Sequence, residues 1–105
     1  MALTKEFKET VKARAERDAS FREALLSEAV NLLISGDVET GKAILRDYIN
    51  ATVGFEKLAK VTGTPSKSLM RMFSANGNPR ANNLLTVIGK LQRATKVHLE
   101  VAANR

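Results

Sequence analysis

The stretch GFEKLAKVTGTPSKSLMRMFSANGNPR, residues 54–80, decides the fold that we predict for this chain. Gly63 can adopt the positive φ that ends a helix. Pro65, which lacks an N–H group, fits the first turn of a following helix, with Thr64 as its N-cap. Ala59 is small enough for two helices to approach closely across a short turn. The spacing predicts two short helices in the arrangement of helix-turn-helix units, with an ordinary pair of antiparallel helices as the alternative.

Length and composition indicate one domain. The 105 residues are enough for a single hydrophobic core and too few for two independent cores. The chain contains no cysteine, so neither a disulfide framework nor a thiolate zinc site is available. The N-terminus has alternating charges where a signal peptide needs an apolar run, and no segment has the length of an apolar transmembrane helix. We therefore expect a cytoplasmic protein that is not in a membrane.

The net charge of +6 is distributed unevenly. Residues 1–53 carry 8 Lys or Arg and 9 Asp or Glu, a net charge of −1. Residues 54–105 carry 9 Lys or Arg and 2 Asp or Glu, a net charge of +7. A cationic half of this kind attracts polyanions and binds them in a salt-dependent way. A solvated charged face is the alternative, but it does not explain the asymmetry.

The first half of the chain reads as helices. Residues 4–17 predict a charged helix with few apolar residues and Thr4 as its N-cap, which either covers the core or becomes ordered on binding a partner. Residues 20–35 predict a core helix that begins with a capping box at Ser20 and ends at Gly36. Residues 38–53 predict a third helix behind Asp37 as N-cap, with Tyr48 in the core and its hydroxyl at the rim. We assign residues 1–36 to an N-terminal helical extension and residues 37–105 to the helix-turn-helix domain.

The second half ends in a predicted strand. Asn, Gly and Pro are concentrated in SANGNPRANN, residues 74–83, which predicts a loop with free backbone N–H groups, followed by a further helix. Residues 96–101, KVHLEV, alternate polar and apolar side chains, which predicts a short β-strand. A lone strand has no partner in its own chain, so we expect pairing with the same strand of a second copy in a homodimer. The residues expected at this dimer interface are Val97, Leu99 and Val101.

The side chains offer little for catalysis. His98 is the only histidine, and it has no cysteine or second histidine to help it bind a metal. The glycines are too scattered for a phosphate-binding loop, and the acidic residues show no inward-facing pair. We predict an all-α protein with no catalytic residues, no metal site and no cofactor.

The second helix of the 54–80 stretch has a face suited to nucleic acid. Lys67 and Arg71 can donate to guanine O6 and N7, and Met70 can contact a thymine methyl group. The predicted base-contacting residues are Ser66, Lys67, Met70 and Arg71. The predicted phosphate-contacting residues are Lys57, Lys60, Ser68, Ser74, Asn76, Asn78 and Arg80. Ordinary surface charge is the alternative for these cations.

Residues 55–91, FEKLAKVTGTPSKSLMRMFSANGNPRANNLLTVIGKL, resemble a group of small bacterial helix-turn-helix regulators known as addiction-module antidotes. These are the HigA-like antitoxins of type II toxin–antitoxin pairs. The resemblance covers about residues 37–101, and its most specific part is the S-x-x-GNPR motif of residues 74–80. Residues 1–36 are longer than the leader of the shortest antidotes.

The resemblance implies a lambda-repressor-like domain that dimerises, binds its own operator and, in antitoxin members, holds a RelE/ParE-like toxin inactive. It places Ser66, Lys67 and Arg71 in the DNA-reading helix and residues 76–80 next to the phosphates. We therefore expect a homodimeric repressor that binds double-stranded DNA with a palindromic sequence. The alternatives are a stand-alone regulator without a toxin and a helical protein-interaction module.

Overall fold

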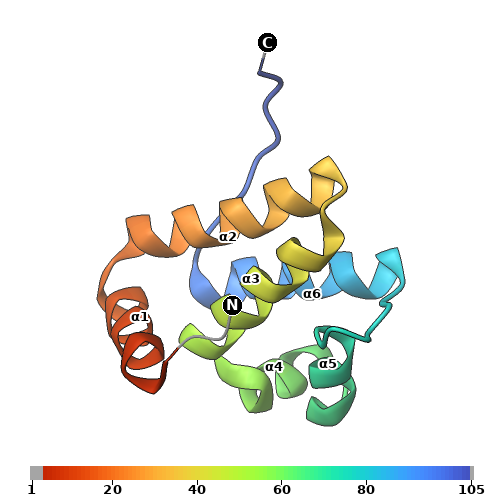
Figure 1. Cartoon of the computed structure of the whole chain (residues 1–105), viewed down its shortest axis with the longest axis horizontal. Helices are drawn as coiled ribbons and strands as arrows, with labels where there is room; N and C mark the ends of the chain where they lie inside the picture. The colour runs from red at the N-terminus through yellow and green to blue at the C-terminus, as the bar shows by residue number, and fades with distance from the viewer. Residues whose placement is uncertain (1–3, 105) are drawn as a thin grey trace.

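A computed structural model describes residues 4–104, which contain six α-helices (Figure 1). The helices are α1 (Lys5–Arg17), α2 (Ala19–Ser35), α3 (Val38–Ala51), α4 (Gly54–Thr62), α5 (Ser66–Met72) and α6 (Ala81–Thr95). α2 lies across one end of the molecule, α4 and α5 lie at the opposite end, and α3 runs between them (Figure 1). The all-α prediction is confirmed for the described residues. None of their helices is long and apolar enough to cross a membrane.

Side-chain caps begin two helices where the sequence predicts them. Thr4 Oγ1 accepts a hydrogen bond from the Phe7 N–H at 3.1 Å, at the start of α1. Asp37 Oδ1 accepts one from the Thr40 N–H at 3.3 Å, at the start of α3. Each bond satisfies one of the N–H groups that a first helical turn leaves without a partner. Gly36, with φ of 97°, ends α2 as predicted.

The predicted capping box at Ser20 is wrong. α2 begins at Ala19, and Asp18 Oδ1 accepts the Phe21 N–H at 3.1 Å. The hydrogen bond from the Phe21 N–H, helped by the nearby Arg14 guanidinium, holds the pKa of Asp18 below its ordinary value, although partial desolvation acts in the opposite direction. The Arg14 Nε also lies 3.6 Å from Asp18 Oδ2, so the corner between α1 and α2 is held by charge as well as by the cap.

The hydrophobic core is shared by α2 to α6. α1 lies at its edge, and Ala15 is the only residue of that helix that is buried. α2 and α3 pack so closely at Gly41 that a Cβ added to this residue would lie only 2.8 Å from Leu33 Cδ2. The buried residues of the core cluster are Leu26, Ala29, Leu45, Tyr48, Ile49, Phe55, Leu58, Leu69, Phe73, Val87, Ile88, Leu91 and Val97. α2 therefore contributes to the same core as the α4–α5 end of the molecule.

Tyr48 joins α3 to the end of α6 inside this core. The side chain is fully buried, and its hydroxyl donates to Thr95 Oγ1 at 2.7 Å. The Thr95 hydroxyl donates in turn to the Leu91 carbonyl at 2.7 Å. The prediction of a hydroxyl at the rim is wrong, since both members of the bond are buried. Burial raises the pKa of the Tyr48 phenol, and the bond to Thr95 partly opposes that rise.

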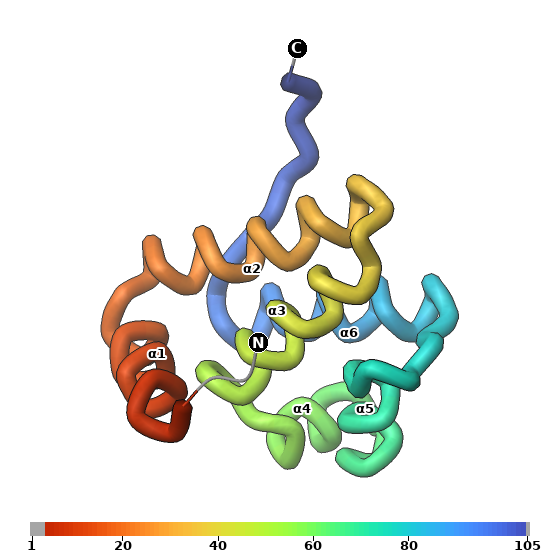
Figure 2. The backbone as a smooth tube through the Cα atoms, in the orientation of Figure 1, coloured from red at the N-terminus to blue at the C-terminus, as the bar shows by residue number. Residues whose placement is uncertain are grey.

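The predicted strand over residues 96–101 is not seen in the described part of the chain. α6 ends at Lys96, with φ of 58°, and Val97 turns back into the core, where its side chain is 3 % exposed. Residues 97–104, here called the C-terminal arm, begin in the core, and their last part extends out of the body of the molecule beyond α2 (Figure 2). The alternating sequence has another cause: Val97 and Leu99 contact the core, whereas His98 and Glu100 are exposed to solvent.

Replacing Tyr48 by Phe removes one buried hydrogen bond and little volume. We expect Tyr48→Phe to lower the free energy of unfolding by about 1 kcal/mol, the usual net contribution of such a bond. Urea denaturation of the variant and the wild type measures this difference. A free energy unchanged by Tyr48→Phe would show that the hydroxyl pairing does not stabilise the fold.

Candidate nucleic-acid interface

α4 and α5 are joined by a connection that hydrogen bonds close tightly. Gly63 has φ of 74° and its N–H donates to the Ala59 carbonyl at 2.9 Å, so the predicted helix end at Gly63 is confirmed. Thr62 Oγ1 donates to the Leu58 carbonyl at 2.8 Å and accepts the Thr64 N–H at 3.2 Å. The next helix begins directly after this connection.

The start of α5 differs slightly from the prediction. We expected Thr64 as N-cap and the proline inside the first turn. Pro65 instead stands just before the helix, with ψ of 143°, and no side chain caps α5. The first N–H groups of α5 therefore have no side-chain acceptor.

α5 is held in place by the residues on its inner face. A helix of seven residues is too short to be stable alone in water. Leu69 is fully buried, and Phe73, which follows the helix, is buried with its ring centroid 6.3 Å from that of Phe55 on α4. These apolar contacts fix the rotation of α5 about its axis, so the opposite face stays exposed.

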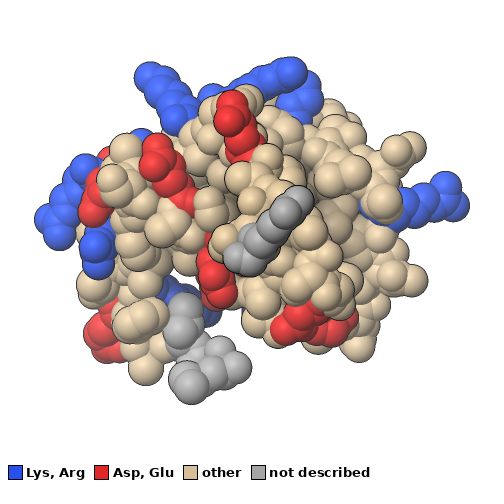
Figure 3. All heavy atoms as spheres, turned by 90° about the horizontal axis from the view of Figure 1, so that it is seen from above, with Lys and Arg blue, Asp and Glu red and all other residues tan. Residues whose placement is uncertain are grey.

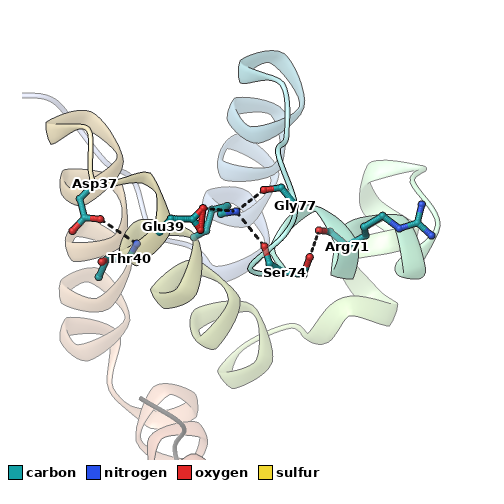
Figure 4. A network of polar contacts seen from close by, with 7 residues as sticks. Asp37, Glu39, Thr40, Arg71, Ser74 and Gly77 are labelled. Carbon is teal, nitrogen blue, oxygen red and sulfur yellow. Dashed lines mark hydrogen bonds and ion pairs between the residues drawn. The ribbon is translucent and has the colours of Figure 1, made fainter.

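The predicted base-contacting residues lie on that opposite face. Lys67, Met70 and Arg71 are exposed, and Ser66 is partly buried. The Arg71 side chain extends away from the protein body (Figure 4). The structure therefore brings these four residues together on one short helix.

The predicted phosphate-contacting residues other than Lys57 lie on α5 or flank it. Lys57 and Lys60 are exposed on α4, and Ser68 is exposed on α5 itself. The residues exposed in the following loop are Asn76, Asn78 and Arg80. Lys57 also lines a hollow with Ala15 and Glu16 of α1 and with Lys96, so it lies on the side of α4 that faces α1 rather than beside α5.

Ser74 and the backbone of its loop are less available than expected. The Ser74 hydroxyl donates to the Arg71 carbonyl at 2.7 Å, so its proton is not free for a phosphate oxygen. The Ser74 N–H also donates to the Arg71 carbonyl, at 3.2 Å, and the Gly77 N–H donates to the Ser74 carbonyl at 3.0 Å. The prediction that these backbone N–H groups are free is wrong for both residues.

Sequence reasoning missed the residue that fixes this loop, Lys42 of α3. Its side chain is 2 % exposed, and its Nζ donates to the Gly77 carbonyl at 2.6 Å and the Ser74 carbonyl at 3.1 Å. Glu39 Oε1 lies 3.2 Å from the same nitrogen (Figure 4). An ammonium group is buried at low cost only when several oxygen atoms surround it, as here. The signal in the sequence was a lysine at an inward position of α3, three residues before Leu45.

Gly77 lets the loop pack directly on the end of α5. A Cβ at this position would overlap the Arg71 carbonyl oxygen and lie 2.7 Å from the Met72 carbonyl oxygen. Only glycine allows the two backbone segments to approach this closely. Together with Lys42, it fixes the loop relative to the exposed face of α5.

The charge of this end of the molecule is almost entirely positive. Residues 54–80 carry five Lys or Arg and a single acidic residue, Glu56. The face seen from above α2 shows Asp and Glu among the Lys and Arg side chains (Figure 3). Among residues 4–104, no group of three or more His, Cys, Asp or Glu side chains is placed to hold a metal ion.

No family model matches this chain, and no curated protein or solved structure matches it. The resemblance to HigA-like antitoxins therefore stays a prediction. The geometry of α4, α5 and the following loop is the basis for a functional assignment.

Replacing Lys42 by Met keeps most of the length of the side chain and removes its charge and its donor. The Gly77 carbonyl would then lose its bond to the ammonium group, and the Ser74 carbonyl would keep only the Gly77 N–H, so we expect Lys42→Met to lower the free energy of unfolding by about 2 kcal/mol. We also expect faster amide hydrogen exchange in the loop that follows α5. Urea denaturation and hydrogen-exchange mass spectrometry measure the two effects.

Glu39→Gln is the matched control. It removes the charge of Glu39, which pairs with Lys42 and has a side chain that is 68 % exposed, and it leaves the loop carbonyls and Lys42 in place. Glu39 is itself exposed to solvent, and glutamine keeps an oxygen near the Lys42 Nζ, so this change should cost no more than about 1 kcal/mol. Equal effects of Glu39→Gln and Lys42→Met would contradict the role assigned to the loop carbonyls.

Proposed function

We propose that this protein is a sequence-specific DNA-binding repressor in which α4 and α5 form a helix-turn-helix and α5 is the recognition helix. The observation that supports this most is the division of α5 into two faces. Leu69 is buried in the core, while Lys67 and Arg71 are exposed on the other side. A short helix presented in this way can enter the major groove of B-DNA.

In this proposal, the side chains on the exposed face of α5 contact the bases. Lys67 and Arg71 donate to guanine O6 and N7, the acceptors that identify this base in the major groove. Met70, which is 54 % exposed, is an apolar group for a thymine methyl. Ser66 lies at the first position of the helix, and its hydroxyl can bond either a base or a phosphate.

Phosphate contacts fall to residues of α4 and of the loop after α5. Lys57 and Lys60 approach the backbone from α4, and Asn76, Asn78 and Arg80 approach it from the loop. These contacts fix the position of α5 on the duplex without reading the sequence. They also make the affinity depend on salt, because each phosphate neutralised releases counterions.

A homodimer follows from the small size of this footprint. Two copies related by a two-fold axis double the contacts and bind a palindromic operator. The resemblance to HigA-like antidotes extends the proposal to an antitoxin that represses its own operon in the cytoplasm and neutralises a RelE/ParE-like toxin. A stand-alone regulator uses the same DNA contacts without that partner.

Selection from random-sequence duplexes, followed by gel-shift titration of the enriched sequence, tests the DNA-binding proposal. We expect a palindromic consensus. The double variant Lys67→Ala/Arg71→Ala should bind this consensus about 100-fold more weakly, since each base contact contributes roughly 1–3 kcal/mol. Lys57→Ala/Lys60→Ala should weaken binding to all duplexes alike and reduce the slope of log affinity against log salt by about 2.

Lys5→Ala/Lys8→Ala removes the same charge from exposed positions on α1 and is the matched control. It should leave affinity for the consensus within about twofold of wild type, because α1 does not contact the duplex in this proposal. No enriched sequence, or equal losses from this control and from Lys67→Ala/Arg71→Ala, would refute recognition by α5.

A further inference from the structure

An apolar groove lies at the base of the C-terminal arm, between α2 and α6. Its volume is about 730 Å³, and its apolar lining includes Val30, Ile34, Leu85, Leu99 and Val101. Three of these side chains are unusually exposed for their type: Ile34 and Leu85 at 65 % and Val101 at 86 %. Large apolar side chains gathered on one surface are typical of a protein contact.

The arm beside this groove has one backbone edge occupied and one edge open. The Leu99 N–H donates to Gln92 Oε1 at 2.9 Å on one edge, after the Val97 N–H has closed the end of α6 by donating to the Gln92 carbonyl at 3.0 Å. In an extended chain, successive residues direct their backbone groups to opposite edges. The other edge carries the backbone groups of His98 and Glu100, which form no hydrogen bond with another described residue.

We infer that the partner on this surface is a second copy of the chain, whose arm pairs antiparallel with this one about a two-fold axis at Leu99. The inference deepens the proposed function, on which it rests for the existence of a dimer. It gives that dimer a surface and a register. The backbone groups on the open edge of each arm form the ladder hydrogen bonds with the other arm. The two arms together then make a two-stranded ladder that a single chain does not contain.

Side-chain pairing selects the register. A two-fold axis at Leu99 places each His98 opposite the partner's Glu100, where an imidazole N–H can donate to the carboxylate. An axis at Glu100 would place two carboxylates directly opposite each other, which is unfavourable in a β-ladder. An axis at Val101 would place Glu100 opposite an alanine and provide no such pair. Within one arm, His98 Nε2 already lies 3.6 Å from Glu100 Oε1, so both side chains are on the same face.

The same axis brings the two grooves together. A residue on a two-fold axis contacts its own copy, and Leu99 lines the groove. Ile34, Leu85 and Val101 of each copy are then covered near the axis. Val97 is buried in its own core, so the surface inferred here includes only Leu99 and Val101 of the three residues expected at the dimer interface.

Single-cysteine variants test the register, because the natural chain contains no cysteine. The variants are Leu99→Cys, Glu100→Cys and Val101→Cys, with Ser68→Cys on α5 as the control for random collision. Residues opposite each other at a non-hydrogen-bonded position have Cα atoms about 4.5 Å apart, within the range of a disulfide. Under mild oxidation without DNA, we expect Leu99→Cys to form the covalent dimer about tenfold faster than the other three variants.

Faster cross-linking of Glu100→Cys or Val101→Cys would overturn this register. The arm-to-arm dimer would be overturned by two results together. These are a cross-linking rate for Leu99→Cys equal to that of Ser68→Cys, and a monomer mass for the wild type in light scattering at about 100 µM. Neither result depends on DNA, so failure here is distinct from failure of recognition by α5.

Discussion

The α4–α5 end of this protein depends on the contact between Lys42 and the carbonyl groups that follow α5. An ammonium group loses its hydration when buried, and that loss is offset only if oxygen atoms replace the water. The Ser74 and Gly77 carbonyls supply two of those atoms from a loop more than thirty residues away in the sequence. α3, the central helix of the core, therefore fixes the loop that follows α5.

This contact explains how so short a helix can present a defined surface. Leu69 and Phe73 anchor the inner face of α5, Lys42 holds the loop after it, and the turn at Gly63 sets its start. The exposed side chains then project from a backbone that is fixed on three sides. Recognition of base edges requires this kind of preorganisation, because a loosely held helix would lose conformational entropy on binding.

The sequence predicted features that depend on neighbouring residues. The caps at Thr4 and Asp37, the helix end at Gly63 and the two faces of α5 all follow from local spacing. Features that depend on distant contacts were missed or misassigned. The hydrogen-bond partners of Lys42 can be identified only in the folded structure, where α3 lies next to the loop. The alternation over residues 96–101 reflects packing of the chain end against its own core rather than an internal strand.

The N-cap of α2 shows a second reason why the sequence alone did not predict the structure. Asp18 and Ser20 are both good N-cap residues and lie two positions apart, so residue preference alone does not rank them. Arg14, one turn before Asp18 on α1, favours the aspartate through its charge. The correct choice thus depended on the corner between two helices, which the sequence pattern does not describe.

An NMR titration of the ¹⁵N-labelled protein with the selected duplex shows which face of the protein meets DNA, because it reports on all backbone N–H groups at once. We expect the largest shift changes on residues 66–71 and 76–80 and on the exposed lysines of α4. Small changes there, with the largest changes in α1 and α2, would contradict recognition by α5.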